Sequence, residues 1–317
     1  MHLAAEAHTL RQRWAARAAR WSPTTRGLLW TSAAGLLFSA LNASMRALAM
    51  DVPAMQSQFL RYAMGLLILL PLVAWRGWRH FVAKDIKGQF WRGGMHSIGL
   101  MLWFAALPRI PLADMTAIGF TGPIFIMIGA RIFFGEPMRW ERWLATVLGF
   151  AGVLIVVGPK LSGSGGWWHL VMLASAPMFA ASFLITKALT RSETAEVILV
   201  WQSITVTLFS LPLALVAWQA ITPLQALAFV GCGVLGSGGH YCLTRSFAVA
   251  DISATQSVKF LDLLWSAFFG YVIFADVPTQ TTMLGGAVIA TATLWVARRE
   301  ARRGSSKTLQ PVDDSRL

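Results

Sequence analysis

The amino-acid sequence predicts an all-α membrane protein whose ten transmembrane helices form two inverted five-helix repeats, with both termini in the cytoplasm. Three observations lead to this fold class: an apolar composition, ten apolar stretches, and a series of short motifs that recurs after 141 residues. Hydrophobic residues make up 56% of the 317 positions and charged residues only 13%, compared with about 25% charged in soluble domains. A water-soluble core cannot bury so much apolar surface, so the chain is predicted to lie in a membrane.

The individual spans are predicted from the length of the apolar stretches. A helix needs about 20 mostly apolar residues to cross the hydrocarbon core of a bilayer. Ten stretches qualify or come close, at residues 28–49, 54–75, 93–107, 112–134, 143–157, 168–189, 197–219, 224–249, 252–274 and 283–297. The third, fifth and tenth are short, so they either use flanking aromatic and Arg residues or lie where the bilayer is thinned.

The two halves of the chain repeat the same short motifs. Arg-Ala-Leu at 46–48 is matched by Lys-Ala-Leu at 187–189, and Leu-Pro-Leu at 70–72 is matched by Leu-Pro-Leu at 211–213. Both intervals are 141 residues (187 − 46 and 211 − 70). A recurrence at one fixed interval is the signature of an internal structural repeat.

Two further pairs of polar residues extend the repeat and bear on function. Arg61 and Gln202 are also 141 residues apart, whereas Glu136 and Asp276 are 140 apart, so one residue is missing from the second copy between these markers. Each copy holds five spans, and an odd number forces the copies to enter the membrane from opposite sides. Inverted repeats of this kind are typical of secondary transporters, whose binding site lies between the halves near the bilayer midplane.

The basic residues predict the orientation. The net charge is +13, and 19 of the 27 Lys and Arg residues lie outside the spans on one predicted side, while only Arg109 and Lys160 lie on the other. The 19 come from segments 11–26 and 76–92, from Arg139, Arg142 and Arg191, and from the tail 298–316. This asymmetry follows the positive-inside rule and indicates a multi-pass protein of the cell inner membrane. Because topology explains the charges, no nucleic-acid partner is predicted.

The predicted organisation has five parts. A basic cytoplasmic tail (1–26) precedes the first repeat (27–160), a Ser/Gly linker (161–166) joins it to the second repeat (167–297), and a cytoplasmic tail (298–317) follows. The first apolar stretch is far longer than the core of a signal peptide, which predicts a retained helix. The Arg-rich, acid-poor start also fits an organellar transit peptide, which stays as an alternative.

These motifs together resemble a known transporter family. The ten spans in two repeats, Arg61 matched by Gln202, and Pro123 thirteen residues before Glu136 resemble the EamA-type branch of the drug/metabolite transporter superfamily. Within it the chain is most similar to YddG-type exporters of aromatic amino acids. The resemblance covers about residues 27–297 and implies a cavity surrounded by spans 1–4 and 6–9, with spans 5 and 10 as buttresses. Leu263 stands where the repeat would place a second proline, which leaves open whether the ninth span kinks.

Ionisable groups inside a bilayer are costly, so each of them is a candidate for function. Lys259 and Asp262 lie three residues apart on one helix face, where they can pair. Lys259 either binds a substrate carboxylate or, with Asp262, forms a structural ion pair, and one of the two could carry a proton. Arg61 either attracts anionic groups into a central cavity or extends its side chain toward the membrane surface.

The remaining cavity candidates are polar or aromatic residues inside the spans. Polar groups there either contact substrate or hydrogen-bond between helices, and aromatic rings either line an apolar pocket or pack against lipid. Clustered glycines at 93–94 and 236–239 allow close helix approach. The full candidate set is Asn42, Arg61, Tyr62, His96, Trp103, Trp201, Gln202, His240, Tyr241, Gln256, Lys259, Asp262 and Trp265.

Other classes of protein fit the sequence less well. Gly236-Ser237-Gly238 with His240 is similar to a serine-hydrolase motif. Both side chains fall on one predicted helix, however, whose N–H groups are not free to form an oxyanion hole. No phosphate-binding glycine loop and no metal-ligand spacing is found, so neither ATP, a cofactor nor a metal is predicted.

The predicted function is therefore export of amino acids, aromatic and other neutral ones, and related small metabolites by alternating access. A monomer is compatible with this function, and the partners are the small-molecule substrate and the lipid bilayer. Three alternatives remain: an importer on the same fold, a transporter of drugs or nucleotide-linked sugars, and, from a different class, an intramembrane enzyme.

Overall fold

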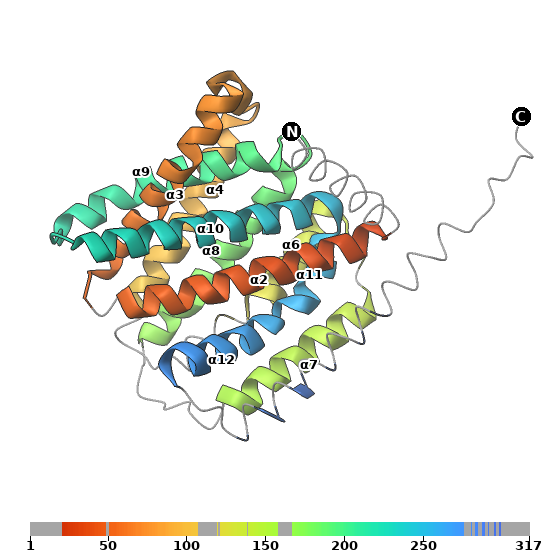
Figure 1. The fold of residues 1–317 in the computed structure, drawn as a ribbon. Helices are drawn as coiled ribbons and strands as arrows, with labels where there is room; N and C mark the ends of the chain where they lie inside the picture. Colours follow the sequence, from red (N-terminus) through yellow and green to blue (C-terminus); the bar gives the residue numbers. More distant parts are fainter. Residues whose placement is uncertain are drawn as a thin grey trace, which may run out of the picture.

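The computed structural model describes residues 21–48, 51–106, 119, 121–137, 139–157 and 167–275, together with isolated residues between 280 and 298. This described part of the chain is helical and contains no strand (Figure 1). Its elements are α2 (Pro23–Leu48), α3 (Ala54–Arg76), the 3-10 helix η1 (Trp78–Phe81), α4 (Ile86–Ala106), α6 (Gly122–Phe134), α7 (Trp140–Val157), α8 (Trp167–Leu189), α9 (Ala195–Val216), α10 (Pro223–Val249), α11 (Ile252–Lys259) and α12 (Leu261–Phe274).

Each of the first nine predicted spans contains a helix of this structure, although α4 begins earlier than predicted and most of the first part of the fourth span lies outside the described residues. Five of them contain stretches that are long and apolar enough to cross a membrane: α2, α3, α8 from Leu170, α9 and α10. The shorter apolar helices are α6 and the part of α12 from Leu264. The protein is therefore an all-α, multi-pass membrane protein. Most of the tenth predicted span lies outside the described residues, so the count of ten and the cytoplasmic termini stay predictions.

Helices from the two halves pack against each other in related pairs. α2 packs along α10, and α4 packs along α8. In the numbering of the spans, these pairs are the first with the eighth and the third with the sixth. Because span 1 corresponds to span 6 and span 3 to span 8, the two pairs are equivalent in the repeat. α3 packs against α9, its own counterpart in the second half. Most of the core is consequently built between the repeats, not within them.

Hydrogen bonds at the helix ends fix the direction of these pairs. At one end of the bundle the Gln56 side chain donates to the carbonyl of Gln219 over 2.7 Å and accepts from its N–H over 2.9 Å, which joins the start of α3 to the end of α9. At the other end Thr31 and Ser246 share a hydrogen bond of 2.7 Å between the start of α2 and the end of α10. The paired helices thus run in opposite directions (Figure 1).

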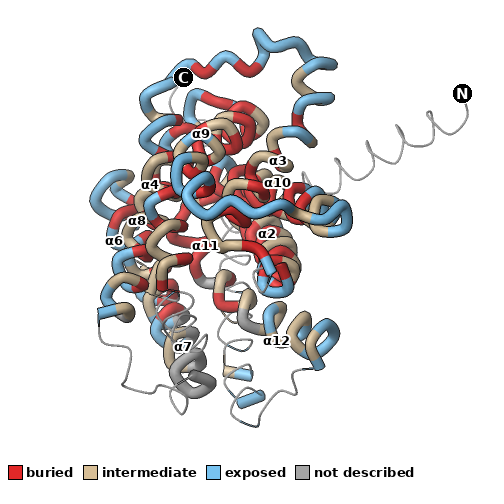
Figure 2. Tube along the Cα trace, turned by 90° about the vertical axis from the view of Figure 1, so that its left-hand side faces the viewer, coloured by how far each residue is buried: buried red, intermediate tan, exposed pale blue. Residues whose placement is uncertain are grey.

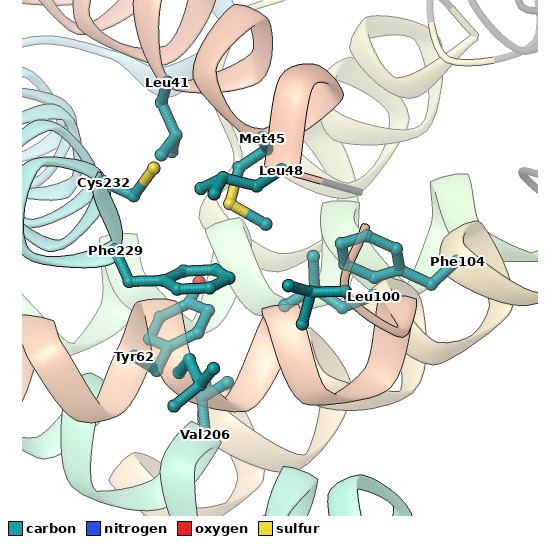
Figure 3. Close-up of a cluster of buried hydrophobic side chains, with 11 residues drawn as sticks. Leu41, Met45, Leu48, Tyr62, Leu100, Phe104, Val206, Phe229 and Cys232 are labelled. Carbon is teal, nitrogen blue, oxygen red and sulfur yellow. The ribbon is translucent and has the colours of Figure 1, made fainter. Parts of the chain in front are cut away.

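The burial pattern separates a packed interior from an apolar outside. Buried positions lie toward the middle of the bundle and exposed ones on its outer faces (Figure 2). Several exposed positions are large and apolar, among them Phe133, Val216 and Leu224, as expected for faces that contact lipid. In the interior, apolar side chains from α2, α3, α4, α9 and α10 converge on one cluster that includes Tyr62, Phe229 and Cys232 (Figure 3).

The ninth span is broken although it lacks the family proline. α11 ends at Lys259 and α12 begins at Leu261, with the buried residue Phe260 between them. The break lies at the position equivalent to the start of α6, because Asp262 is 140 residues after Gly122. α6 has Pro123 in its first turn, and in the ninth span a Lys259–Asp262 pair spans the break instead. The start of α12 therefore matches the start of α6 in the repeat, while the residues that accompany it differ.

Candidate substrate-binding site

A buried polar network crosses the interface between the repeats. The Tyr62 hydroxyl on α3 lies at its centre, 2.8 Å from His96 Nε2 on α4 and 3.2 Å from His240 Nε2 on α10. All three side chains are buried. Buried polar groups need hydrogen-bond partners, and these three residues from two repeats satisfy one another.

The network continues from His240 to a buried arginine. Gln202 Nε2 on α9 is 3.2 Å from His240 Nε2, and the Gln202 carbonyl oxygen accepts a hydrogen bond from Arg92 on α4. Arg92 also donates to Thr186 on α8 and, over 3.1 Å, to the carbonyl of Ile198. Arg92 therefore ties α4 to α8 and α9, and it orients the Gln202 amide toward His240.

Arg92 corrects one of the sequence predictions. It was counted among the cytoplasmic basic residues of segment 76–92, but its side chain is only 2% exposed. The reason is that α4 begins at Ile86, seven residues before the predicted start of the third span at Gly93. The shortness of that predicted span was the available signal, because extending it toward its N-terminus brings Arg92 into the bundle.

A small cavity lies beside this network between α3, α9 and α10. It has room for about one water molecule and is lined by Arg61, Tyr62, Gly65, Leu199, Gln202, Ser203, Gly233, Gly236, Ser237 and His240. Ligand sites usually hold roughly 300–1,000 Å³, so the surrounding helices must separate to admit a substrate. Arg61 and Gln202, which occupy equivalent positions in the two repeats, both face this cavity.

Arg61 makes the cavity electropositive. Its guanidinium donates to the Tyr62 hydroxyl over 3.3 Å and lies 4.6 Å from the centre of the Tyr62 ring. The described residues that line the cavity include no carboxylate. A guanidinium keeps its charge and can offer several N–H donors at once. The cavity is therefore suited to groups that accept hydrogen bonds or carry negative charge.

Aromatic rings enclose the two histidines. The ring of Phe38 on α2 lies 4.9 Å from that of His240 in an edge-to-face arrangement. Phe179 and Phe183 on α8 lie 5.3 and 6.3 Å from His96. These rings separate the polar network from the lipid-facing surface, and a low local dielectric strengthens the interactions inside it.

The structure brings some of the predicted site residues together and leaves others apart. Arg61, Tyr62, Gln202 and His240 line the cavity, and His96 lies behind Tyr62, out of the lining. The others lie outside the lining. Three aromatic residues contact other parts of the bundle: Trp201 donates to the Phe81 carbonyl, Tyr241 packs on Trp30, and Trp103 packs on Phe104. Gln256 forms a hydrogen bond within α11, Trp265 lies on α12, and Asn42 is exposed.

Lys259 and Asp262 form the ion pair that their spacing predicts. Lys259 Nζ lies 2.7 Å from Asp262 Oδ2, and the side chains are 21% and 24% exposed. Asp262 packs directly on α2 at Gly35, where an added Cβ would meet its carboxylate. Phe38 lies between this pair and the network, because it contacts His240 and is 5.9 Å from Lys259 Nζ. The pair is thus near the cavity without lining it.

Several proteins that are similar to this chain are named as transporters. A riboflavin transporter of Rhizobium johnstonii is 34% identical over 87% of this chain and 92% of its own length. An S-adenosylmethionine uptake transporter of Rickettsia prowazekii is 30% identical over 78% and 84%. A pseudopaline exporter of Pseudomonas aeruginosa is 28% identical over 86% and 96%. These names differ from the aromatic amino-acid exporters that the sequence resemblance indicated.

The fold and the family agree with these relatives. A crystal structure of a protein that is 18% identical has a TM-score of 0.75 and is matched over 87% of this chain and 98% of its own. A profile of the EamA-like transporter family matches the chain twice, over residues 25–158 and 166–298. The protein is a transporter and not an enzyme, and these matches show that it belongs to the EamA-like transporter family.

Proposed function

We propose that this protein is a secondary transporter of the cell inner membrane that moves a small planar-ring metabolite rich in hydrogen-bond acceptors, with riboflavin as the first candidate. The observation that carries the proposal is the donor-rich cavity between the repeats. Arg61, Tyr62, Gln202 and His240 all line it, and the Arg61 guanidinium has N–H donors beyond the one that it gives to Tyr62. A riboflavin ring system offers carbonyl oxygens and ring nitrogens that such donors can bind.

The charge of the site supports a choice among the substrates of the relatives. Arg61 lines the cavity, and Arg92 lies one hydrogen bond behind Gln202. Two like charges within a few ångströms repel each other strongly in a medium of low dielectric constant. A sulfonium cation such as S-adenosylmethionine is therefore disfavoured, whereas neutral acceptors and carboxylates are favoured.

Export of aromatic amino acids, the function predicted from the sequence, is the second candidate. It is favoured by Arg61, because a guanidinium can bind a carboxylate through two parallel hydrogen bonds. Phe38 beside His240 would supply an aromatic contact for the side chain.

The position of the cavity supports an alternating-access mechanism. Arg61 lies seven residues from the start of α3 and Leu199 lies four residues from the start of α9. These two helices run in opposite directions, so the lining residues come from opposite ends of α3 and α9 and the cavity lies away from both ends of the bundle. We propose that the two repeats close in turn on either side of this cavity, as in other inverted-repeat transporters.

Transport by the purified protein in vesicles tests the proposal. We expect exchange of labelled riboflavin across the membrane, weaker exchange of phenylalanine, and none of S-adenosylmethionine. Arg61→Gln copies the residue of the second repeat and should reduce riboflavin exchange about tenfold or more, because a hydrogen bond to a charged group contributes about 1.5–3 kcal/mol.

The matched control is Arg76→Gln, which removes an arginine at the far end of the same helix. It should leave the exchange rate close to that of the wild type. Preferred exchange of S-adenosylmethionine, or equal losses in both variants, would contradict the assignment of the cavity.

A further inference from the structure

The Tyr62 hydroxyl lies between two imidazoles but carries a single proton. It can donate that proton to His96 Nε2, 2.8 Å away, or to His240 Nε2, 3.2 Å away, and it must accept from the other ring or from Arg61. The hydrogen bonds along His240–Tyr62–His96 therefore all donate in one direction, and donors and acceptors can exchange roles when a proton is added at one end.

We infer that His240, Tyr62 and His96 form a proton relay that couples transport of the substrate to movement of one proton in the same direction. This inference rests on the proposed function of the cavity. His240 and Tyr62 line the cavity, so a proton can enter from it, whereas His96 lies behind Tyr62 and against α8.

The proton transfer balances along this line. A hydronium ion in the cavity protonates His240 and becomes water. His240 Nε2–H then gives its proton to the Tyr62 oxygen, while the Tyr62 O–H gives its own proton to His96 Nε2. Tyr62 ends with one proton as it began, and the net result is one proton moved from His240 to His96. Once the cavity opens to the other side, the same steps in reverse return the proton through Tyr62 and His240 to water there, and His96 is neutral again.

Protonation of His240 also changes contacts between the repeats. Neutral His240 has a ring nitrogen that accepts from the Gln202 amide, at 3.2 or 3.3 Å. A protonated imidazole has only donors, so the Gln202 amide loses that acceptor and must turn. Its carbonyl oxygen is held by Arg92, which in turn binds Thr186 and Ile198. The added proton thus changes hydrogen bonds that involve α4, α8 and α9, which come from both repeats.

The charges around the relay explain why the substrate would bring the proton with it. The charged groups that face the relay are Arg61 from α3, Arg92 from α4 and Lys259 from α11, and the nearby carboxylate of Asp262 on α12 is already paired with Lys259. The residues that α2, α8 and α9 present to the relay do not titrate: Phe38, Ser182, Phe179, Phe183 and Gln202.

Arg61 and Arg92 oppose a further positive charge on the relay while the cavity is empty, whereas Asp262 offsets the charge of Lys259. A substrate carbonyl or carboxylate on Arg61 offsets part of this repulsion, so substrate and proton bind together. The two then cross in the same direction, and an inward proton gradient favours uptake of the substrate.

Vesicles loaded with wild-type protein test this coupling with labelled riboflavin. With the membrane potential clamped, a gradient that is acidic outside should drive accumulation inside, up to about tenfold for each pH unit if one proton moves per substrate. In vesicles with a trapped pH dye, substrate added outside should acidify the lumen.

His96→Gln is the variant that separates coupling from binding. The amide can still hydrogen-bond to Tyr62 but cannot take a proton, and residue 96 lies outside the cavity lining. We expect substrate exchange at equal pH to persist and accumulation driven by the pH gradient to be lost. His80→Gln, an exposed histidine on η1, is the matched control and should keep both activities.

The outcomes separate this inference from the proposed function. Three results would overturn the relay and leave the proposed function intact, provided that riboflavin is exchanged. They are no effect of the pH gradient, no acidification by the wild type, and full gradient-driven accumulation in folded His96→Gln. Accumulation driven only by an acidic lumen overturns movement in the same direction. Failure of folded wild-type protein to exchange any of the solutes removes the proposed function and the relay together.

Discussion

Arg92 shows how one side chain can set the geometry of the site. It is buried, it has no carboxylate partner among the described residues, and its three hydrogen bonds go to Thr186, Ile198 and Gln202. A buried charge is tolerated only when hydrogen bonds replace its hydration. Because the partners come from α8 and α9, satisfying Arg92 also locks these helices to α4.

Replacing Arg92 by Met should therefore destabilise the protein. The substitution keeps much of the apolar volume but strands the Gln202 carbonyl oxygen and the Thr186 hydroxyl. We expect a loss of about 2 kcal/mol or more, seen as a lower melting temperature in detergent. Arg191→Met changes an exposed arginine and should have little effect, and equal melting temperatures for the two variants would contradict this role of Arg92.

The limits of sequence-based prediction are visible at the same residues. Arg61 and Gln202 were predicted because the repeat aligns them, and they do face one cavity. Arg92 was not predicted, because basic residues before an apolar stretch look like a membrane-flanking loop. Its burial depends on acceptors from α8 and α9, about one hundred residues away in the chain, which no local pattern reveals.

At the level of helices, two crossings repeat the same close contact. On α10, a Cβ added at Gly233 would lie 2.7 Å from the backbone nitrogen of Gly65 on α3. On α4, a Cβ added at Gly93 would meet Thr205 on α9. The repeat relates the two sites to within one residue, since 65 + 141 is 206 and 233 − 141 is 92. Both crossings flank the cavity and the network.

Gly233→Ala should consequently force α10 away from α3. The nearest atoms belong to the backbone of α3, which a side-chain rotation cannot relieve, so we expect a loss of about 1–3 kcal/mol and slower substrate exchange. Gly231→Ala, two residues earlier on the same helix, meets open space and should be neutral or slightly stabilising. Thermal melting in detergent compares the two variants, and equal values would contradict the crossing.

The break in the ninth span is a second case that the residues alone left open. A proline was the expected cause of a kink, and Leu263 occupies its place. The interruption at Phe260 is present all the same, directly before α12, which occupies the position of α6 in the repeat. The residue type alone therefore left the interruption of this span undecided.

For the whole molecule, charged side chains join helix ends at one end of the bundle, which the basic residues predict to be cytoplasmic. The Glu136 carboxylate accepts from the N–H groups of Ile252 and Ser253, at 2.9 and 3.0 Å, at the start of α11. Lys187 donates to the carbonyls of Phe247 and Ala250, both at 2.6 Å, at the end of α10. Such contacts satisfy helix ends that otherwise lack partners.

The repeat predicts a second set of these contacts at the opposite end of the bundle. Lys187 corresponds to Arg46, which lies 4.4 Å from the ring centre of Phe274 at the end of α12. Glu136 corresponds to Asp276, which lies outside the described residues. In the proposed alternating-access mechanism, two such sets would form and release in turn, and Glu136 would hold one end closed.

Glu136→Gln should loosen that end without unfolding the protein. The amide keeps one acceptor but loses the charge and the second acceptor that hold the start of α11. The two cysteines of the chain report the result: Cys242 packs with Ile252 near this end of α10, whereas Cys232 belongs to the central cluster. Maleimide labelling followed by peptide mass analysis should show Cys242 reacting several-fold faster, with Cys232 unchanged.

Glu196→Gln, which changes a partly exposed carboxylate, is the control. Faster labelling of both cysteines would indicate general unfolding, and unchanged labelling of Cys242 would show that Glu136 does not close this end.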